Sequence, residues 1–184
     1  MASFSKGTTL AEKLGAIHES LAKANLKHAF GGAISLAYCI DEPRGTRDID
    51  VNIFISAERA RDAAAALPTE VEVPEQAISE IVRDGQTRVW WDDTPVDLFL
   101  NNLPIHEEVA NEVRWVPFAG SEIPVLSCQS LVIFKAFFNR TKDWADIEAV
   151  AKVEPAFVLS AADRVEQLVA PDEEIITRLR QIAG

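Results

Sequence analysis

Hydrophobic and polar residues alternate in several short segments of the chain, with the period expected of half-buried β-strands. In residues 48–55, Ile49, Val51 and Ile53 fall on one face of the predicted strand. The same alternation predicts a hairpin of two strands, 87–91 and 96–100, joined across residues 92–95. Shorter strands are expected at residues 28–30, 71–73 and 113–118.

Other segments carry apolar residues three and four positions apart, which predicts helices. The first helix begins with a capping box formed by Thr9 and Glu12, and it ends near Asn25. Segment 75–84 fits either a helix or a strand. Further helices are expected at residues 33–40, 58–67 and 103–111.

The last third of the chain is expected to be helical. Ser127 is a predicted N-cap, and interruptions are expected at residues 139–141 and at Pro171. The whole pattern predicts an α/β (α+β) fold, with a small mixed sheet flanked by helices and a helical C-terminal part. We therefore divide the 184 residues into a core of residues 1–126 and a helical part of residues 127–184 packed on it.

Composition limits the function classes. The chain is 48% hydrophobic and 26% charged, with a formal net charge of −11, which argues against broad non-specific DNA binding. It does not exclude a local basic cleft. No apolar run approaches the ~18 residues of a membrane span, so a cytoplasmic protein with no membrane partner is expected. Cys39 and Cys128 are expected to be buried free thiols rather than a disulfide, in keeping with a reducing compartment.

Acidic residues on the predicted strands are the first candidates for chemistry. Asp48 and Asp50 share the face opposite the apolar side chains, and the two carboxylates repel each other unless a cation lies between them. Mg²⁺ prefers such oxygen ligands. Asp97 stands alone among strong strand formers, so a metal ion or a basic partner is expected near it. The alternative is a strand carboxylate that faces water.

A glycine pair precedes these acids. Gly31 and Gly32 lie between the strand 28–30 and the helix 33–40, where backbone amides and the helix dipole favour an anion such as a triphosphate. Ser35 is close enough to the helix start to offer a hydroxyl. The alternative is a tight turn without a ligand. Arg44 and Arg47 in the following loop would either contact phosphates or balance nearby acids.

The ordered set of Gly31, Gly32, Asp48, Asp50 and Asp97 resembles the nucleotidyltransferase superfamily, which has the polymerase-beta-like fold. The resemblance implies that Asp48, Asp50 and Asp97 hold two Mg²⁺ ions and act in catalysis. It also implies that the glycine turn binds an NTP. The reaction would move NMP to an acceptor hydroxyl and release pyrophosphate.

A second group of polar residues lies in the predicted C-terminal helices. Lys135 falls within a phenylalanine-rich helix and calls for an anionic partner, and Arg140 and Lys142 follow it closely. This basic group could hold the phosphates of the nucleotide or an acceptor backbone. The alternative is a helix surface with local salt bridges to Asp143, Asp146 and Glu148.

The spacing of Lys135, Arg140, Lys142, Asp143 and Asp146 resembles the downstream motif of AbiEii-type toxins of bacterial toxin-antitoxin systems. That resemblance implies a catalytic Lys135, and NTP contacts by Arg140, Lys142 and Asp146. Arg47 is a further candidate for an NTP contact, from its position in the loop before Asp48. It further implies transfer to a tRNA 3′ end and a cognate antitoxin.

Three other interpretations stay open. The first is a nucleotidyltransferase that modifies a small molecule such as an antibiotic. The second is a non-catalytic module of this fold that binds a partner. The third is a plain α/β domain with solvated acids. A drug acceptor would suit an acidic cleft, whereas Lys135, Arg140 and Lys142 argue mildly against it.

Overall fold

The computed structural model describes residues 7–42, 45–168 and 173–184. Within these residues the chain forms a mixed sheet of seven strands in the order β3-β4-β5-β2-β1-β7-β6. The strands are β1 (His28–Phe30), β2 (Ile49–Ser56), β3 (Val71–Glu72), β4 (Gln86–Trp91), β5 (Thr94–Asn101), β6 (Arg114–Phe118) and β7 (Ser121–Val125). The mixed sheet flanked by helices confirms the predicted fold class.

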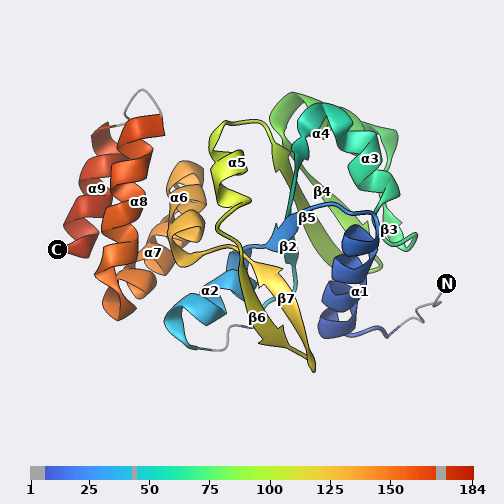
Figure 1. Cartoon of the computed structure of the whole chain (residues 1–184), viewed down its shortest axis with the longest axis horizontal. Helices are drawn as coiled ribbons and strands as arrows, with labels where there is room; N and C mark the ends of the chain where they lie inside the picture. Colours follow the sequence, from blue (N-terminus) through green and yellow to red (C-terminus); the bar gives the residue numbers. More distant parts are fainter. Residues whose placement is uncertain (1–6, 43–44, 169–172) are drawn as a thin grey trace.

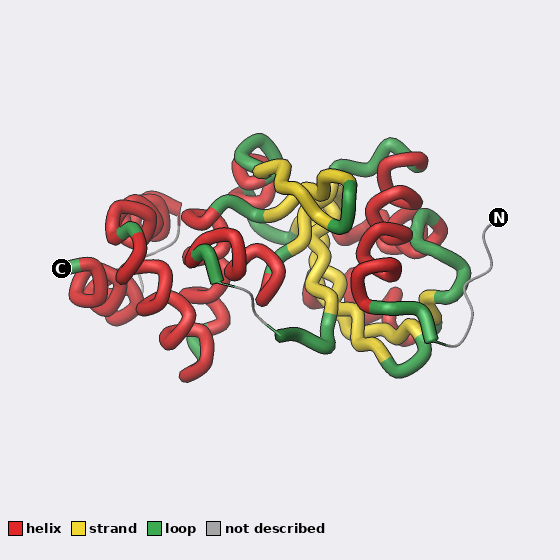
Figure 2. Tube along the Cα trace, turned by 90° about the horizontal axis from the view of Figure 1, so that it is seen from below, coloured by secondary structure: helices red, strands yellow, loops and turns green. Residues whose placement is uncertain are grey.

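Helices cover both faces of the sheet (Figure 1), and Figure 2 shows the strands between two groups of helices. One hydrophobic cluster joins the sheet to α1 (Leu10–Lys23), η1 (Ala57–Arg59), α3 (Ala60–Ala65) and α4 (Glu75–Asp84). The second cluster joins α2 (Gly32–Ile40) and α5 (Ile105–Val109) to α6 (Cys128–Phe138), α7 (Thr141–Val153), α8 (Pro155–Leu168) and α9 (Glu173–Ala183). Helix α2 of the core therefore packs with the C-terminal helices.

Local sequence signals explain where several elements begin. The Thr9 hydroxyl accepts a hydrogen bond from the Glu12 amide, and the Glu12 carboxylate accepts one from the Thr9 amide, so the predicted capping box is confirmed. The ambiguous segment 75–84 is helix α4, because it buries Ala77, Ile78 and Ile81 on one face. Strand β7 was not predicted, since Pro124 near its centre weakens the strand signal.

The predicted break between the two helices after Ser127 is confirmed. Asn139 ends α6 in the left-handed conformation, at φ 53°, and α7 begins two residues later at Thr141. The Asn139 side-chain oxygen accepts a hydrogen bond from the Trp144 indole at 2.7 Å. This contact fixes α7 relative to α6, and both helices carry candidate site residues.

The expectation of two free thiols was wrong, because Cys39 of α2 and Cys128 of α6 form a disulfide. Their Cα atoms lie 5.5 Å apart, within the range that a disulfide requires. The two residues are separated by 89 positions in the chain, and only the packing of α2 against α6 brings them together. Within the described part of the chain, no helix is both long and apolar enough to cross a bilayer.

Candidate active site

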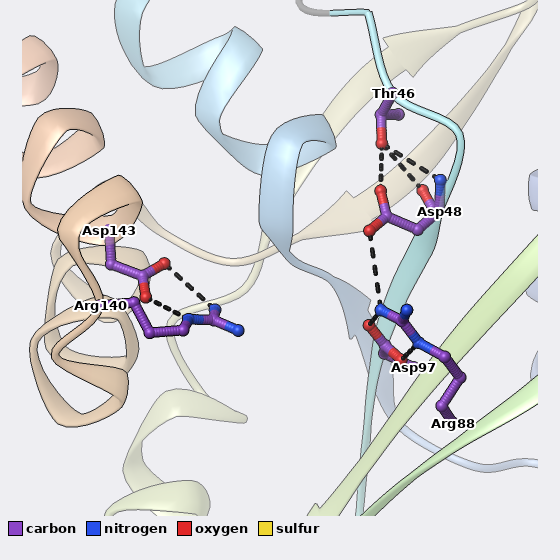
Figure 3. A network of polar contacts seen from close by, with 6 residues as sticks. All are labelled: Thr46, Asp48, Arg88, Asp97, Arg140 and Asp143. Carbon is purple, nitrogen blue, oxygen red and sulfur yellow. Dashed lines mark hydrogen bonds and ion pairs between the residues drawn. The ribbon is translucent and has the colours of Figure 1, made fainter.

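The three predicted aspartates converge at the centre of the sheet. Strands β2 and β5 run parallel, and their register places Asp50 directly beside Asp97. Asp48 immediately precedes β2, and its carboxylate accepts a hydrogen bond from the Thr46 hydroxyl at 2.5 Å. Asp48 and Asp97 lie close to each other in Figure 3. The alternation of β2 turns Ile49 and Val51 into the core, so the acids occupy the opposite face.

Asp50 has a strongly perturbed acidity. Burial, then the negative charges of Asp97 and Asp48, raises the pKa of Asp50 to about 6. Lys135 and Lys142 act in the opposite direction but do not compensate. The aspartate cluster therefore holds more negative charge than its own protein neighbours balance.

The glycine pair lies against the same carboxylate. The Gly31 amide donates a hydrogen bond to the Asp50 carbonyl at 2.9 Å, and helix α2 begins at Gly32. Gly32 adopts φ +52°, and a Cβ atom there would lie 1.9 Å from Asp50 Oδ2. Both features require glycine. The turn thus brings the start of α2 as close to Asp50 as the backbone allows.

Two residues assigned to the nucleotide site lie elsewhere. Ser35 is buried, and its hydroxyl donates a hydrogen bond to the Leu126 carbonyl at 2.9 Å, so it fixes α2 to the end of β7 rather than facing the cleft. Arg47 is exposed and is not part of the cleft lining. Arg44, whose role was left open, lies outside the described residues.

Arg88 is a site residue that the sequence analysis missed. It lies on β4 directly opposite Asp97 of β5. Its Nε and Nη2 atoms donate to the two carboxylate oxygens of Asp97, each at 2.7 Å. Nη2 also lies 3.9 Å from Asp48 Oδ2. The basic partner expected for Asp97 is therefore present, and Figure 3 shows its guanidinium between the two aspartates.

The facing wall of the site comes from α6 and α7. Lys135 is almost fully buried, and its ammonium donates to Asp146 at 2.7 Å and lies 3.5 Å from Asp143. Arg140 donates to both oxygens of Asp143, at 2.6 and 3.2 Å. These contacts join most of the predicted C-terminal motif into one cluster, while Lys142 is exposed. The anionic partners of Lys135 are thus Asp143 and Asp146 of the same motif.

Asp143 is held as a carboxylate. Burial by itself would raise its pKa, but the hydrogen bond from Arg140 and the charges of Lys135 and Arg140 outweigh burial and lower the pKa of Asp143. Figure 3 shows the Arg140–Asp143 pair facing the aspartates of the sheet across the gap between the two walls. Arg140 also lies over the Phe138 ring, 4.7 Å from its centroid.

These walls enclose a cleft with two connected halves. The polar half has a volume of about 490 Å³ and contains all three candidate metal ligands together with Arg88, Lys135, Arg140 and Lys142. The aromatic half has a volume of about 320 Å³, and its lining includes Phe99, Leu103, His106, Phe134, Phe137 and Phe138. Gly32, Asp50 and Lys135 line both halves. The sequence analysis did not identify the aromatic half.

The donor set suits a hard divalent cation. The described residues that line the polar half include six aspartates and four cationic side chains. One of the six, Asp84, pairs with Arg83 outside this lining, and the remaining aspartates still outnumber the cations. Carboxylate oxygens are what Mg²⁺ binds. Among the described residues, no group of three or more His, Cys, Asp or Glu side chains is arranged closely enough to hold a metal ion. The chemistry of the residues fits the metal, but their arrangement, with Arg88 between Asp48 and Asp97, would have to change.

Comparison with known proteins supports the fold. The solution structure of the antibiotic-resistance factor ANT(2'')-Ia superposes with a TM-score of 0.56, at 14% identity, over 93% of this chain and 89% of that chain. The crystal structure of ANT(2'')-Ia in complex with adenylyl-2''-tobramycin superposes with a TM-score of 0.54, at 14% identity, over 95% of this chain and 97% of that chain. The crystal structure of an antigenic nucleotidyltransferase-like protein from Paracoccidioides brasiliensis superposes with a TM-score of 0.51, at 13% identity, over 93% of this chain and 92% of that chain.

No protein-family model matches the sequence, and no curated protein matches it significantly. The fold is therefore that of nucleotidyltransferase-like proteins, at sequence identities that establish the fold alone.

Proposed function

We propose that the protein is a metal-dependent nucleotidyltransferase that moves NMP from an NTP to an acceptor hydroxyl and releases pyrophosphate. The pairing of Asp50 with Asp97 on adjacent parallel strands, with Asp48 alongside, is the observation that carries this proposal. A cleft lined by more carboxylates than cationic side chains repels a triphosphate unless cations enter with it. Binding of the nucleotide together with divalent ions removes that conflict.

Asp48, Asp50 and Asp97 would hold two Mg²⁺ ions. Bound there, the ions supply Lewis acidity that lowers the pKa of the acceptor hydroxyl and offsets negative charge on the phosphates. The acceptor oxygen bonds to the α-phosphorus while the bond to the pyrophosphate oxygen breaks. The hydroxyl proton passes to a carboxylate of the site, which we assign to Asp97.

The remaining cleft residues bind and orient the nucleotide. The Gly31–Gly32 turn and the start of α2 offer backbone amides to the phosphates, beside Asp50. Lys135, Arg140 and Lys142 offset charge on the departing pyrophosphate from the facing wall. Asp143 and Asp146 hold Lys135 and Arg140 in place, so we assign Asp146 to positioning Lys135 rather than to direct contact with phosphate.

For the acceptor we propose an RNA 3′ end, such as that of tRNA, on the basis of the AbiEii-type motif. The five residues of that motif all line the polar half of the cleft, where the nucleotide would bind: Lys135, Arg140, Lys142, Asp143 and Asp146. A toxin of this kind would be paired with an antitoxin.

One observation favours a second acceptor class. Asp143 and Asp146 pair with Lys135 and Arg140, which leaves little free positive charge for an RNA backbone and a polar half with an excess of acid. Such a cleft suits a small cationic molecule with hydroxyl groups. ANT(2'')-Ia, which has the same fold, is an antibiotic-resistance factor.

A transfer assay tests the proposal. The purified protein is incubated with Mg²⁺ and each labelled NTP in turn, with either total tRNA or a panel of aminoglycosides. Asp48→Ala/Asp50→Ala serves as the inactive variant. Asp93→Asn, in the hairpin turn and outside the cleft, is the matched control and should retain full activity.

Label in tRNA with the wild type alone would establish the RNA acceptor, and label in a drug would establish the second class. Equal labelling by wild type and the double variant would refute the assignment of the aspartates. Absence of transfer to every acceptor, with metal-dependent NTP binding retained, would favour a non-catalytic binding module.

A further inference from the structure

The guanidinium of Arg88 lies where a divalent cation would have to approach Asp97. Both oxygens of Asp97 accept hydrogen bonds from Arg88 at 2.7 Å, in the fork geometry that makes such pairs strong. The same guanidinium faces Asp48 at 3.9 Å. Two of the three candidate metal ligands are therefore in contact with one cationic side chain of the protein.

The register of the sheet explains this arrangement. Arg88 of β4, Asp97 of β5 and Asp50 of β2 lie opposite one another across three adjacent strands, so all three side chains emerge on the same face. The β-carbons of Arg88 and Asp97 are held as neighbours by the backbone. Only the long arginine arm beyond its β-carbon is free to change the contact.

The side chain of Arg88 is more exposed than the carboxylates it contacts, so it can leave them without a change in the buried core. The side chain of Arg88 is 51% exposed, whereas that of Asp97 is 18% exposed and that of Asp48 is 40% exposed. The guanidinium can therefore move into solvent or along the cleft wall while Asp97 stays in place. Arg88 also lines the polar half of the cleft, where the phosphates of a nucleotide would lie.

We propose that Arg88 is a displaceable counter-ion that couples metal entry to nucleotide binding; this inference rests on the proposed function. Without nucleotide, Arg88 competes with the divalent cation for Asp97 and Asp48, and the metal alone binds weakly. A bound triphosphate gives the displaced guanidinium a new anionic partner. Metal and nucleotide then strengthen each other's binding, because both favour the state in which Arg88 has left Asp97.

The test measures binding rather than turnover. Mn²⁺ binding to the purified chain is followed by electron paramagnetic resonance of the free ion, alone and with the α,β-methylene analogue of each NTP. The variants are Arg88→Gln, Arg59→Gln and Asp50→Asn. Arg59→Gln is the matched control, since it removes an exposed arginine that also donates to an aspartate, Asp62, but lies outside the lining of the cleft.

Arg88→Gln should bind Mn²⁺ alone roughly tenfold or more tightly than the wild type, the scale expected when a unit charge a few ångströms away is removed. The strengthening of Mn²⁺ binding by the nucleotide analogue should largely disappear in this variant. Arg59→Gln should change Mn²⁺ affinity less than about threefold, because its charge lies outside the cleft lining and is solvent-screened, and should keep the coupling.

Nuclear magnetic resonance of arginine Nε–H groups gives an independent readout. The Arg88 signal, identified by its loss in Arg88→Gln, should shift when Mg²⁺ and analogue are added together. Arg59, whose Nε donates to Asp62 at 2.8 Å on the surface, is the internal reference and should not shift.

The outcomes separate the inference from the proposed function. Asp50-dependent Mn²⁺ binding with unchanged affinity and coupling in Arg88→Gln, or an unshifted Arg88 signal in the loaded protein, would overturn the counter-ion role alone. Mn²⁺ binding that is absent from all proteins, or identical in Asp50→Asn, would overturn both this inference and the proposed metal site.

Discussion

Asp50 of β2 and Asp97 of β5 lie side by side in register, with no residue between them on the sheet. Burial and the negative charge of Asp97 together raise the pKa of Asp50 to about 6. The two carboxylates therefore repel each other in the cleft of the metal-free protein, and this repulsion lowers the stability of the fold when both are ionised.

Asp50 should make the stability of the metal-free wild type fall, relative to that of Asp50→Asn, as pH rises from about 4 to about 6. In that window the folded state binds more protons at Asp50, with its pKa of about 6, than the unfolded state does at its ordinary value of 3.8. The loss is complete above pH 6 and reaches roughly 1–3 kcal/mol, since each pKa unit corresponds to about 1.4 kcal/mol. Urea unfolding in the presence of a chelator measures it.

Replacing the carboxylate removes this penalty. Asp50→Asn should therefore raise the free energy of unfolding above pH 6, by roughly 1–3 kcal/mol, and change it little near pH 4. The exposed Asp93→Asn should show no such pH-dependent gain. A destabilised Asp50→Asn at pH 8 would show that the carboxylate is better balanced than the described contacts indicate.

A methyl group at Gly32 should displace Asp50. Gly32→Ala places a Cβ against Asp50 Oδ2 and forces alanine into the left-handed region, so we expect a loss of about 2 kcal/mol or more and a loss of NMP transfer. Gly15→Ala, in α1 with nothing within 4 Å of the new methyl group, should instead stabilise by about 0.5–1 kcal/mol. Thermal unfolding and the transfer assay compare the two.

Much of the fold follows from local pattern. Alternation located β2 and β5, helical spacing located α1 and the C-terminal helices, and the left-handed Asn139 sits at the predicted break. Two features were missed. The Cys39–Cys128 disulfide depends on a contact between distant segments, which a single sequence does not reveal. Strand β7 forms a local hairpin with β6, but Pro124 weakens its strand signal.

The sequence predicted the aspartates of the candidate site but not Arg88, the arginine that pairs with Asp97. The sequence pattern predicts residues 92–95 as a four-residue connection, which would place Arg88 opposite Phe99. The observed hairpin has only Asp92 and Asp93 in its turn, and this shifts the register so that Arg88 faces Asp97. Because register decides every cross-strand pair, an error of two residues at the turn concealed the strongest contact of the site.

The disulfide between α2 and α6 should contribute measurably to stability. It joins the helix that begins at Gly32 to the helix that carries Lys135, across 89 residues of chain. Reduction with dithiothreitol should lower the free energy of unfolding by about 2–4 kcal/mol. The Cys39→Ser/Cys128→Ser protein should show that lower stability with and without reductant. Equal stability of the oxidised and reduced wild type would contradict the prediction.

Lys135 and Lys142 lie on the same wall of the cleft but differ in burial. Replacing each should therefore distinguish a contribution to folding stability from a contribution to NTP binding. Lys135→Met leaves Asp146 without its 2.7 Å partner and removes a second charge from buried Asp143, so a loss of about 2 kcal/mol in urea unfolding is expected. Lys142 is exposed, and Lys142→Met should change stability by no more than about 0.5 kcal/mol. Both variants should weaken NTP binding, since both remove positive charge from the cleft. A Lys135→Met protein as stable as the wild type would show that the Lys135–Asp146 contact adds nothing to folding and is retained for the nucleotide alone.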